Sequence, residues 1–303
     1  MDPVAELRRH AEAAEVTLGV SAVHLESGRR VQLESGERFP LASTYKVPMA
    51  AYALHLVASD RLSLDTLIEV RAEDKVVSSS ITRLFPHDGI QLSLLNLMEA
   101  TLIQSDNTAT DVLLRTIGGG EAVTAWLEAE GIEGLRVDRS TADLIRDYMA
   151  MPRESGSMAE QYAAATFDDL TDEDWADFYR ALLEDPRDQG TPDAMVELLS
   201  GLWQDTYLDA EHGETLREIM GRCLTGRNRL SGRMPAHQLP LAHKTGTLGG
   251  TVNDVGVIQL PDDRGTVVLA VFARGTSSLD VEAGERAIAE AARTLYDYFL
   301  FTD

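Results

Sequence analysis

The chain has 303 residues, enough to bury a full hydrophobic core and to form one compact unit of two subdomains. Its 50 acidic and 27 basic residues give a formal net charge of -23, which argues against nucleic acid or an anionic membrane as a partner. The single cysteine, Cys223, excludes an internal disulfide, and we expect it to be a packed side chain. The histidines show no metal-binding spacing, so we expect neither a metal nor a cofactor.

Hydropathy bears on the compartment of the protein. No apolar run reaches membrane-spanning length, and no apolar segment of the signal-peptide type precedes Val16. We therefore expect a cytoplasmic protein as the sequence is written, or a periplasmic or secreted one if a signal was removed from its N-terminus. We also expect a monomer without a membrane partner.

The first predicted elements are a β-hairpin and a buried helix. Alternating apolar residues predict strands over residues 16–25 and 30–34. The run from Val47 to Ala58 is apolar enough for a buried helix, and Pro48 falls in its first turn, where its missing N–H costs little.

The segment Ser43-Thr44-Tyr45-Lys46 directly precedes this helix and has the form of a nucleophile with its base. A serine hydroxyl is a weak nucleophile until an adjacent base takes its proton, and a spacing of three residues puts Lys46 on the same helical face as Ser43. Lys46 acts as a base only if its pKa is depressed by burial or by a nearby cation such as Lys244. The helix N-terminus favours negative charge on a substrate carbonyl oxygen. The alternative is an ordinary N-cap at Ser43 and a solvated Lys46.

A second polar motif, Ser105-Asp106-Asn107, lies between apolar segments at residues 92–103 and 108–114 and predicts a tight link between two helices. Ser105 can relay a proton to a leaving group, while Asn107 can hold Lys46 and a substrate amide. The alternative is a set of ordinary helix caps.

The third motif, Lys244-Thr245-Gly246, lies in a predicted strand over residues 241–247. Lys244 and Thr245 can bind a substrate carboxylate, and Gly246 lets substrate approach the strand edge. The N–H groups of Thr247 and Ser43 can form an oxyanion hole. The alternative is a hairpin with a stray lysine.

The C-terminal part of the chain predicts a second hairpin and a long helix. Residues 252–260 and 266–274 have strand character. Residues 281–301 carry an apolar stripe at helical spacing, which indicates a core-facing helix. The stripe is made by Ile288, Ala292, Leu295 and Phe299.

The ordered trio of motifs resembles the class A β-lactamase family, within the superfamily of serine β-lactamases and penicillin-binding proteins. The resemblance extends over residues 39–48, 105–119, 242–257 and 287–299. It implies an α/β fold with an antiparallel sheet flanked by helices, plus an all-helical domain. The α/β domain would comprise residues 1–45 and 225–303, and the helical domain residues 46–224. Arg229 matches an arginine that in some members helps to hold the substrate carboxylate; a solvent-exposed role is the alternative.

One departure from the family concerns deacylation. Family members carry a glutamate and an asparagine that hold the water which hydrolyses the acyl-enzyme. Thr141 stands at the glutamate position and Ile145 at the asparagine position. Acylation by Ser43 and Lys46 survives this change, whereas rapid deacylation loses both groups that hold the water. Asp143 is the nearest carboxylate and is a candidate substitute base.

The region after Arg139 is longer than usual. Arg139 and Asp188 resemble the ion pair that closes a loop in the family, but here they are 188 minus 139, or 49, positions apart. A helix-start signal at residues 171–174 leads into a predicted helix that stops before Pro186. Four aromatic residues indicate an ordered insertion: Phe167, Trp175, Phe178 and Tyr179. We interpret the insertion, about residues 139–188, as a lid over one side of the site; peripheral decoration is the alternative.

The sequence thus predicts a serine hydrolase that resembles class A β-lactamases and opens a β-lactam amide through a Ser43 acyl-enzyme, with slow deacylation or an unusual base. Two alternatives remain. One is a peptidase or esterase of the penicillin-binding superfamily. The other is a covalent β-lactam-binding sensor that does not turn over. The predicted partner in each case is a small-molecule β-lactam or a related amide or ester.

Overall fold

Strands from both ends of the chain form one five-stranded sheet in the computed structural model, which describes residues 2–151, 156–165, 170–234, 240–275 and 281–302. The strand order is β2-β1-β9-β8-β7, and every neighbouring pair is antiparallel. Both predicted hairpins are confirmed. The strands are β1 (Val16–His24), β2 (Arg30–Leu33), β7 (Leu241–Leu248), β8 (Thr251–Gln259) and β9 (Thr266–Gly275).

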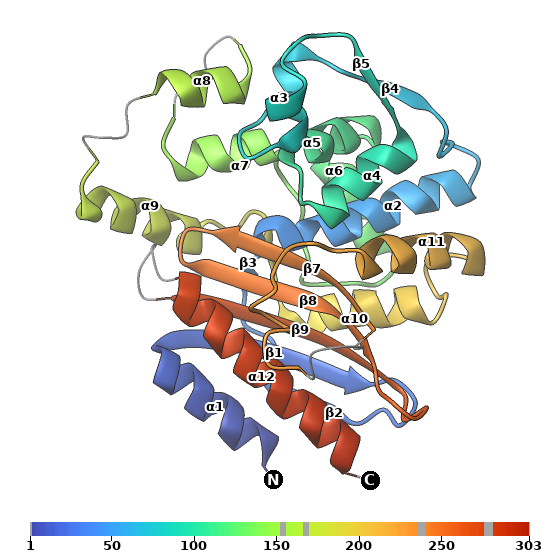
Figure 1. Cartoon of the computed structure of the whole chain (residues 1–303), viewed down its shortest axis with the longest axis vertical. Coiled ribbons are helices and arrows are strands. Elements are labelled where there is room, and N and C mark those ends of the chain that lie inside the picture. Colours follow the sequence, from blue (N-terminus) through green and yellow to red (C-terminus); the bar gives the residue numbers. More distant parts are fainter. Residues whose placement is uncertain (1, 152–155, 166–169, 235–239, 276–280, 303) are drawn as a thin grey trace.

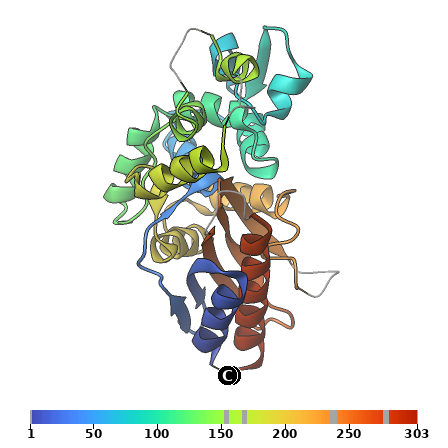
Figure 2. The same ribbon diagram turned by 90° about the vertical axis from the view of Figure 1, so that its left-hand side faces the viewer.

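Helices cover both faces of this sheet. Helices α1 (Pro3–Ala14) and α12 (Val281–Phe301) lie side by side on one face (Figures 1 and 2). Successive side chains of β9 point to opposite faces of the sheet. Leu269 and Val271 pack in one hydrophobic core with α12, whereas Ala270 and Phe272 pack in a second core on the other face. That core includes α10 (Pro192–Trp203), which lies against β9 and β1. The stripe predicted for the C-terminal helix is therefore confirmed as a core face.

The helical part of the molecule surrounds α2 (Lys46–Ala58), which is buried on nearly every side as its apolar sequence predicts. Around it lie α4 (Leu94–Ile103), α5 (Asn107–Thr116), α6 (Gly120–Ala129) and α11 (Ala210–Gly221). A small sheet of β4 (Leu67–Val70) and β5 (Ile90–Ser93) packs against α4 and α5. The one-turn segments η2 (Ala72–Asp74) and α3 (Ser80–Leu84) lie between its two strands in the sequence. Strand β5 takes Leu92, which the sequence had placed in a helix. The helix begins only after Ser93, whose hydroxyl caps it.

The described part of the insertion contains three helices: α7 (Thr141–Tyr148), α8 (Met158–Ala164) and α9 (Asp172–Glu184). Helix α9 begins with the predicted capping box, in which Thr171 and Asp174 exchange hydrogen bonds. The short strands β3 (Phe39–Pro40) and β6 (Gln189–Gly190) pair at the base of the insertion. Phe167 lies outside the described residues. Among the helices described, none is long and apolar enough to cross a membrane.

Candidate active site

Ser43 lies in a single 3₁₀ turn, η1 (Ala42–Tyr45), that runs directly into α2. Ala42 takes the left-handed φ of 45°, a strained conformation for a residue with a side chain. Strand β7 packs against this turn. A Cβ on Gly246 would lie 2.7 Å from the Leu41 carbonyl oxygen and 3.0 Å from the Ser43 nitrogen. The absence of a side chain at Gly246 thus makes room for the turn η1 that carries Ser43. The sequence instead suggested that this glycine gives substrate access to the strand edge.

Lys46 is fully buried and faces the second motif. Its Nζ lies 2.9 Å from both the Ser105 carbonyl oxygen and Asn107 Oδ1, and 3.2 Å from Ser105 Oγ. Burial lowers the pKa of Lys46 well below its ordinary value, and the charge of Lys244 lowers it further. A neutral amine uses its two N–H groups on the two closer acceptors and keeps its lone pair for a hydroxyl proton. The solvated Lys46 of the alternative interpretation is therefore wrong.

Ser105 lies between two lysines. Its Oγ is 3.2 Å from Lys46 Nζ and 2.9 Å from Lys244 Nζ, and its backbone has a left-handed φ of 57°. Asp106 is the N-cap of α5, where its carboxylate accepts the Ala109 N–H. The cap interpretation thus holds for Asp106, whereas Ser105 and Asn107 are turned toward the buried amines.

Lys244 and Arg229 provide the positive charge of the site. Lys244 Nζ donates to Ser105 Oγ at 2.9 Å and to the Thr245 carbonyl oxygen at 2.7 Å. Burial lowers the pKa of Lys244 to about 8, although Cys223 and Asp254 oppose this shift. Thr245 lines a cleft beside these residues, and its Oγ1 lies 2.6 Å from Thr225 Oγ1.

Arg229 is only 6% exposed, so the solvent-exposed alternative is wrong. Its guanidinium donates to Glu285, at 3.1 Å, and to the carbonyl oxygens of Gly246 and Asn253. A further N–H reaches Thr247 Oγ1 at 2.6 Å. Arg229 therefore joins the end of β7 to its neighbour β8 and reaches the cleft beside Thr247.

Thr141 is buried. Its hydroxyl lies 2.7 Å from Tyr45 Oη, and it is not among the described residues that line the cleft, whereas Ile145 is. The carboxylate of Asp111 accepts the backbone N–H groups of Thr141 and Ala142, at 2.6 and 2.9 Å. Burial raises the pKa of Asp111 to about 6, against the effect of these hydrogen bonds. Neither Tyr45 nor Asp111 is among the site residues predicted from the sequence. A carboxylate among the apolar residues of a buried helix was the available signal.

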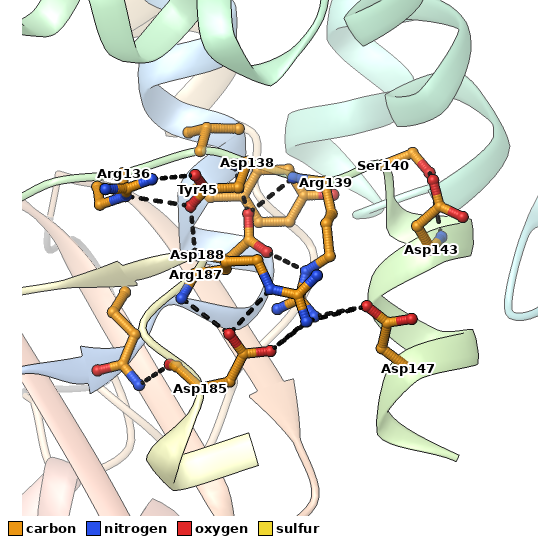
Figure 3. Close-up of polar contacts among 12 residues, drawn as sticks. Tyr45, Arg136, Asp138, Arg139, Ser140, Asp143, Asp147, Asp185, Arg187 and Asp188 are labelled. Atoms are coloured by element: carbon orange, nitrogen blue, oxygen red, sulfur yellow. Dashed lines mark hydrogen bonds and ion pairs between the residues drawn. The ribbon is translucent and has the colours of Figure 1, made fainter. Parts of the chain in front are cut away.

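The structure does not bring Asp143 to the nucleophile. Its backbone N–H is capped by Ser140 Oγ, at 3.0 Å, and its carboxylate pairs with Arg146 at 3.4 Å. The side chain is 40% exposed and is not among the described residues that line the cleft. Figure 3 shows Asp143 beside Ser140, at the start of α7.

The predicted pair of Arg139 and Asp188 is present and belongs to a larger network (Figure 3). Arg139 Nε lies 2.6 Å from Asp188 Oδ2, while Asp188 Oδ1 accepts the backbone N–H groups of Asp138 and Arg139. Arg139 also pairs with Asp147, near the end of α7, and with Asp185, just after α9, at 3.0 and 2.9 Å. These bonds tie both ends of the insertion together.

The motifs converge on one cleft of 720 Å³. One part of its wall is polar, and the other part is apolar and aromatic. Of the described residues in this wall, none is an aspartate or a glutamate. The polar part comprises Ser43, Ser78, Gln104, Ser105, Asn107, Thr225, Arg229, Thr245 and Thr247, and the apolar part includes Ile145, Tyr148, Met149, Tyr162, Trp175 and Leu248.

Known proteins share this architecture over almost the whole chain. The family model described as the beta-lactamase enzyme family matches residues 2–299. Beta-lactamase VEB-1 of Pseudomonas aeruginosa is 27% identical over 261 residues, which cover 83% of this chain and 75% of that protein. The carbapenem-hydrolyzing beta-lactamase KPC of Klebsiella oxytoca is 29% identical over 279 residues, covering 91% and 82%. A solved ancestral class A beta-lactamase superimposes with a TM-score of 0.79 at 31% identity, covering 97% of this chain and 99% of that one. The chain therefore belongs to the beta-lactamase enzyme family and has the class A fold.

Proposed function

We propose that this serine hydrolase of the class A type acylates Ser43 with a β-lactam and releases the product slowly. The observation that carries the proposal is the composition of the cleft. Ser43, Lys46, Ser105 and Lys244 are assembled for acylation. For deacylation, by contrast, the cleft is poorly equipped: Ile145 lines it, and the described lining residues include no carboxylate to activate a water.

The arrangement supports a complete acylation step. Lys46 Nζ accepts the proton of Ser43 Oγ as this oxygen bonds to the lactam carbonyl carbon. The backbone N–H groups of Ser43 and Thr247 stabilise the negative carbonyl oxygen. The carbon–nitrogen bond then breaks, while the Ser105 hydroxyl gives its proton to the departing nitrogen and receives one from Lys46, 3.2 Å away. Lys46 is neutral again at the end of the step, and the substrate is held as an ester.

The ester is expected to persist, because the family's water-holding residues are absent. At position 145 the cleft offers an isoleucine side chain, which neither donates nor accepts a hydrogen bond. At position 141 the hydroxyl is engaged with Tyr45, and Asp111 is occupied by two backbone N–H groups. Water near the ester thus lacks a carboxylate base among the described residues of the cleft.

A chromogenic cephalosporin tests this function. We expect a rapid burst of ring opening of one equivalent per protein, followed by turnover at least about 100-fold slower, since general-base assistance is typically worth about 10²–10⁴-fold. Ser43→Ala removes the burst. Fast, linear turnover by the wild-type protein without a burst would contradict slow deacylation. Absence of ring opening by the wild-type protein would contradict acylation by a β-lactam.

The pH dependence of acylation follows from the buried lysines. Lys244 must be charged to hold a substrate carboxylate. The second-order rate constant for acylation of Ser43 is therefore expected to fall as the pH rises through about 8, the pKa of Lys244. Lys244→Arg lowers the rate but moves this falling limb to higher pH, because a guanidinium keeps its charge. Burst rates between about pH 6 and pH 10 measure both profiles. A falling limb at the same pH in both proteins would show that Lys244 is not its source.

A further inference from the structure

We propose that the aromatic wall built by the insertion selects β-lactams with a flat, apolar acyl substituent, and that Trp175 and Tyr148 are the residues that determine this specificity. The inference rests on the proposed function, because it concerns the substrate of the same cleft. It replaces the lid interpretation of the insertion with a fixed side wall.

The wall is a packed aromatic cluster. Tyr148, at the end of α7, and Trp175, in the first turn of α9, both line the cleft. Phe178 contacts both of them: its ring centroid lies 5.8 Å from that of Trp175 and 6.5 Å from that of Tyr148, edge to face in each case. Such arrangements are the favoured ones for aromatic pairs. The cluster therefore presents ring surface that is already ordered to the cleft.

The wall is also fitted against the sheet. Gly249 lies at the turn after β7 with a positive φ of 53°, and a Cβ there would lie 2.6 Å from Tyr148 Oη and 3.0 Å from a ring carbon of Tyr179. Only a glycine lets the rings of α7 and α9 approach so closely to the strand that carries Lys244 and Thr247. The wall thus stands directly beside the substrate-binding strand.

The network around Arg139 fixes the two helices that carry the wall. Asp147 immediately precedes Tyr148, and Asp185 follows the last residue of α9. Arg139 and Arg187 both pair with these two carboxylates, at distances from 2.7 to 3.2 Å (Figure 3). A wall held this firmly loses little side-chain freedom when a ligand packs on it, which favours selective binding.

The polarity of the cleft indicates the kind of substrate. Arg229 lines the same cleft as the aromatic wall, and so does Ser105, to whose Oγ the Lys244 Nζ donates at 2.9 Å. The described lining residues offer no carboxylate to pair with an ammonium group. A β-lactam whose carboxylate pairs with Lys244 and Arg229 can place its acyl substituent on these rings, where a neutral aryl group is favoured over a free amine.

Benzylpenicillin and 6-aminopenicillanic acid test this inference, because they share the bicyclic core and its carboxylate and differ in the phenylacetyl group. The readout is the second-order rate constant for Ser43 acylation. We expect Trp175→Ala to slow acylation by benzylpenicillin about tenfold and by 6-aminopenicillanic acid about twofold or less. Trp175→Phe should retain most of the wild-type ratio between the acylation rate constants of the two compounds. Arg180→Ala, on the exposed side of α9, is the matched control and leaves both constants unchanged.

Thermal unfolding confirms that each variant is folded. Equal effects of Trp175→Ala on both compounds, or no effect on either, would overturn the aromatic-wall proposal while leaving Ser43 acylation intact. Failure of both compounds to acylate the wild-type protein would instead overturn the proposed function, and the inference with it.

Discussion

Replacing Lys46 by methionine is expected to slow acylation of Ser43 by about 10²–10⁴-fold, the range that general-base catalysis contributes. Methionine fills a similar volume without a basic nitrogen, so the cleft keeps its shape while the proton of Ser43 loses its acceptor. The effect should be on the rate of acylation, because Lys244 and Arg229 still hold the carboxylate. Stopped-flow measurement of the burst rate provides the test.

The chain offers a matched control, since Lys75 is the only lysine outside the motifs. Lys75 pairs with Asp88 and with the Pro86 carbonyl oxygen, away from the cleft. Lys75→Met should leave the burst rate within about twofold of wild type. A Lys46→Met protein that acylates as fast as Lys75→Met would show that another group takes the proton of Ser43.

Replacing Thr141 by glutamate together with Ile145 by asparagine is expected to shorten the acyl-enzyme lifetime by about 100-fold or more. Positions 141 and 145 are four apart in α7 and share a face, and Ile145 already lines the cleft. Glutamate is long enough to extend past Tyr45 toward that cleft, while the amide at 145 offers a hydrogen bond to water. Burial beside Asp111 raises the pKa of the new carboxyl, as suits a base acting near neutrality.

The control is the pair Thr141→Gln with Ile145→Asn, which has the same shape without a base. The rate of return of free protein after acylation, followed for both double variants, separates the two effects. If the glutamine variant regains activity as fast as the glutamate variant, the base at 141 is not what wild type lacks.

Local patterns predicted most of the fold because each depends on neighbouring residues. The two hairpins, the stripe of the final helix and the capping box at Thr171 are read from spacing alone, and the structure confirms them. The exception at Leu92 has a cause outside its own segment. Pairing with Ile68 on the partner strand decides its conformation, and a single-segment pattern does not contain that partner.

The site was less predictable because its details depend on tertiary contacts. The three motifs named the residues around Ser43, but the burial of Lys46 and Arg229 required the surrounding helices and sheet. Asp143 was chosen by distance along the sequence, and the helix turns it toward Ser140 and Arg146. Asp111 lies 30 residues from Thr141, so no local pattern links the two. The aromatic wall likewise requires the ion pairs that join the ends of the insertion.

Intact-mass spectrometry after mixing with benzylpenicillin tests the central claim most directly, with Ser43→Ala beside it. We predict that the wild-type protein gains the mass of one whole benzylpenicillin and keeps it for hours, while the Ser43→Ala protein gains nothing. An adduct that disappears within seconds while hydrolysed penicillin accumulates would contradict slow deacylation. The persistence of an equal adduct on the Ser43→Ala protein would contradict the assignment of the nucleophile.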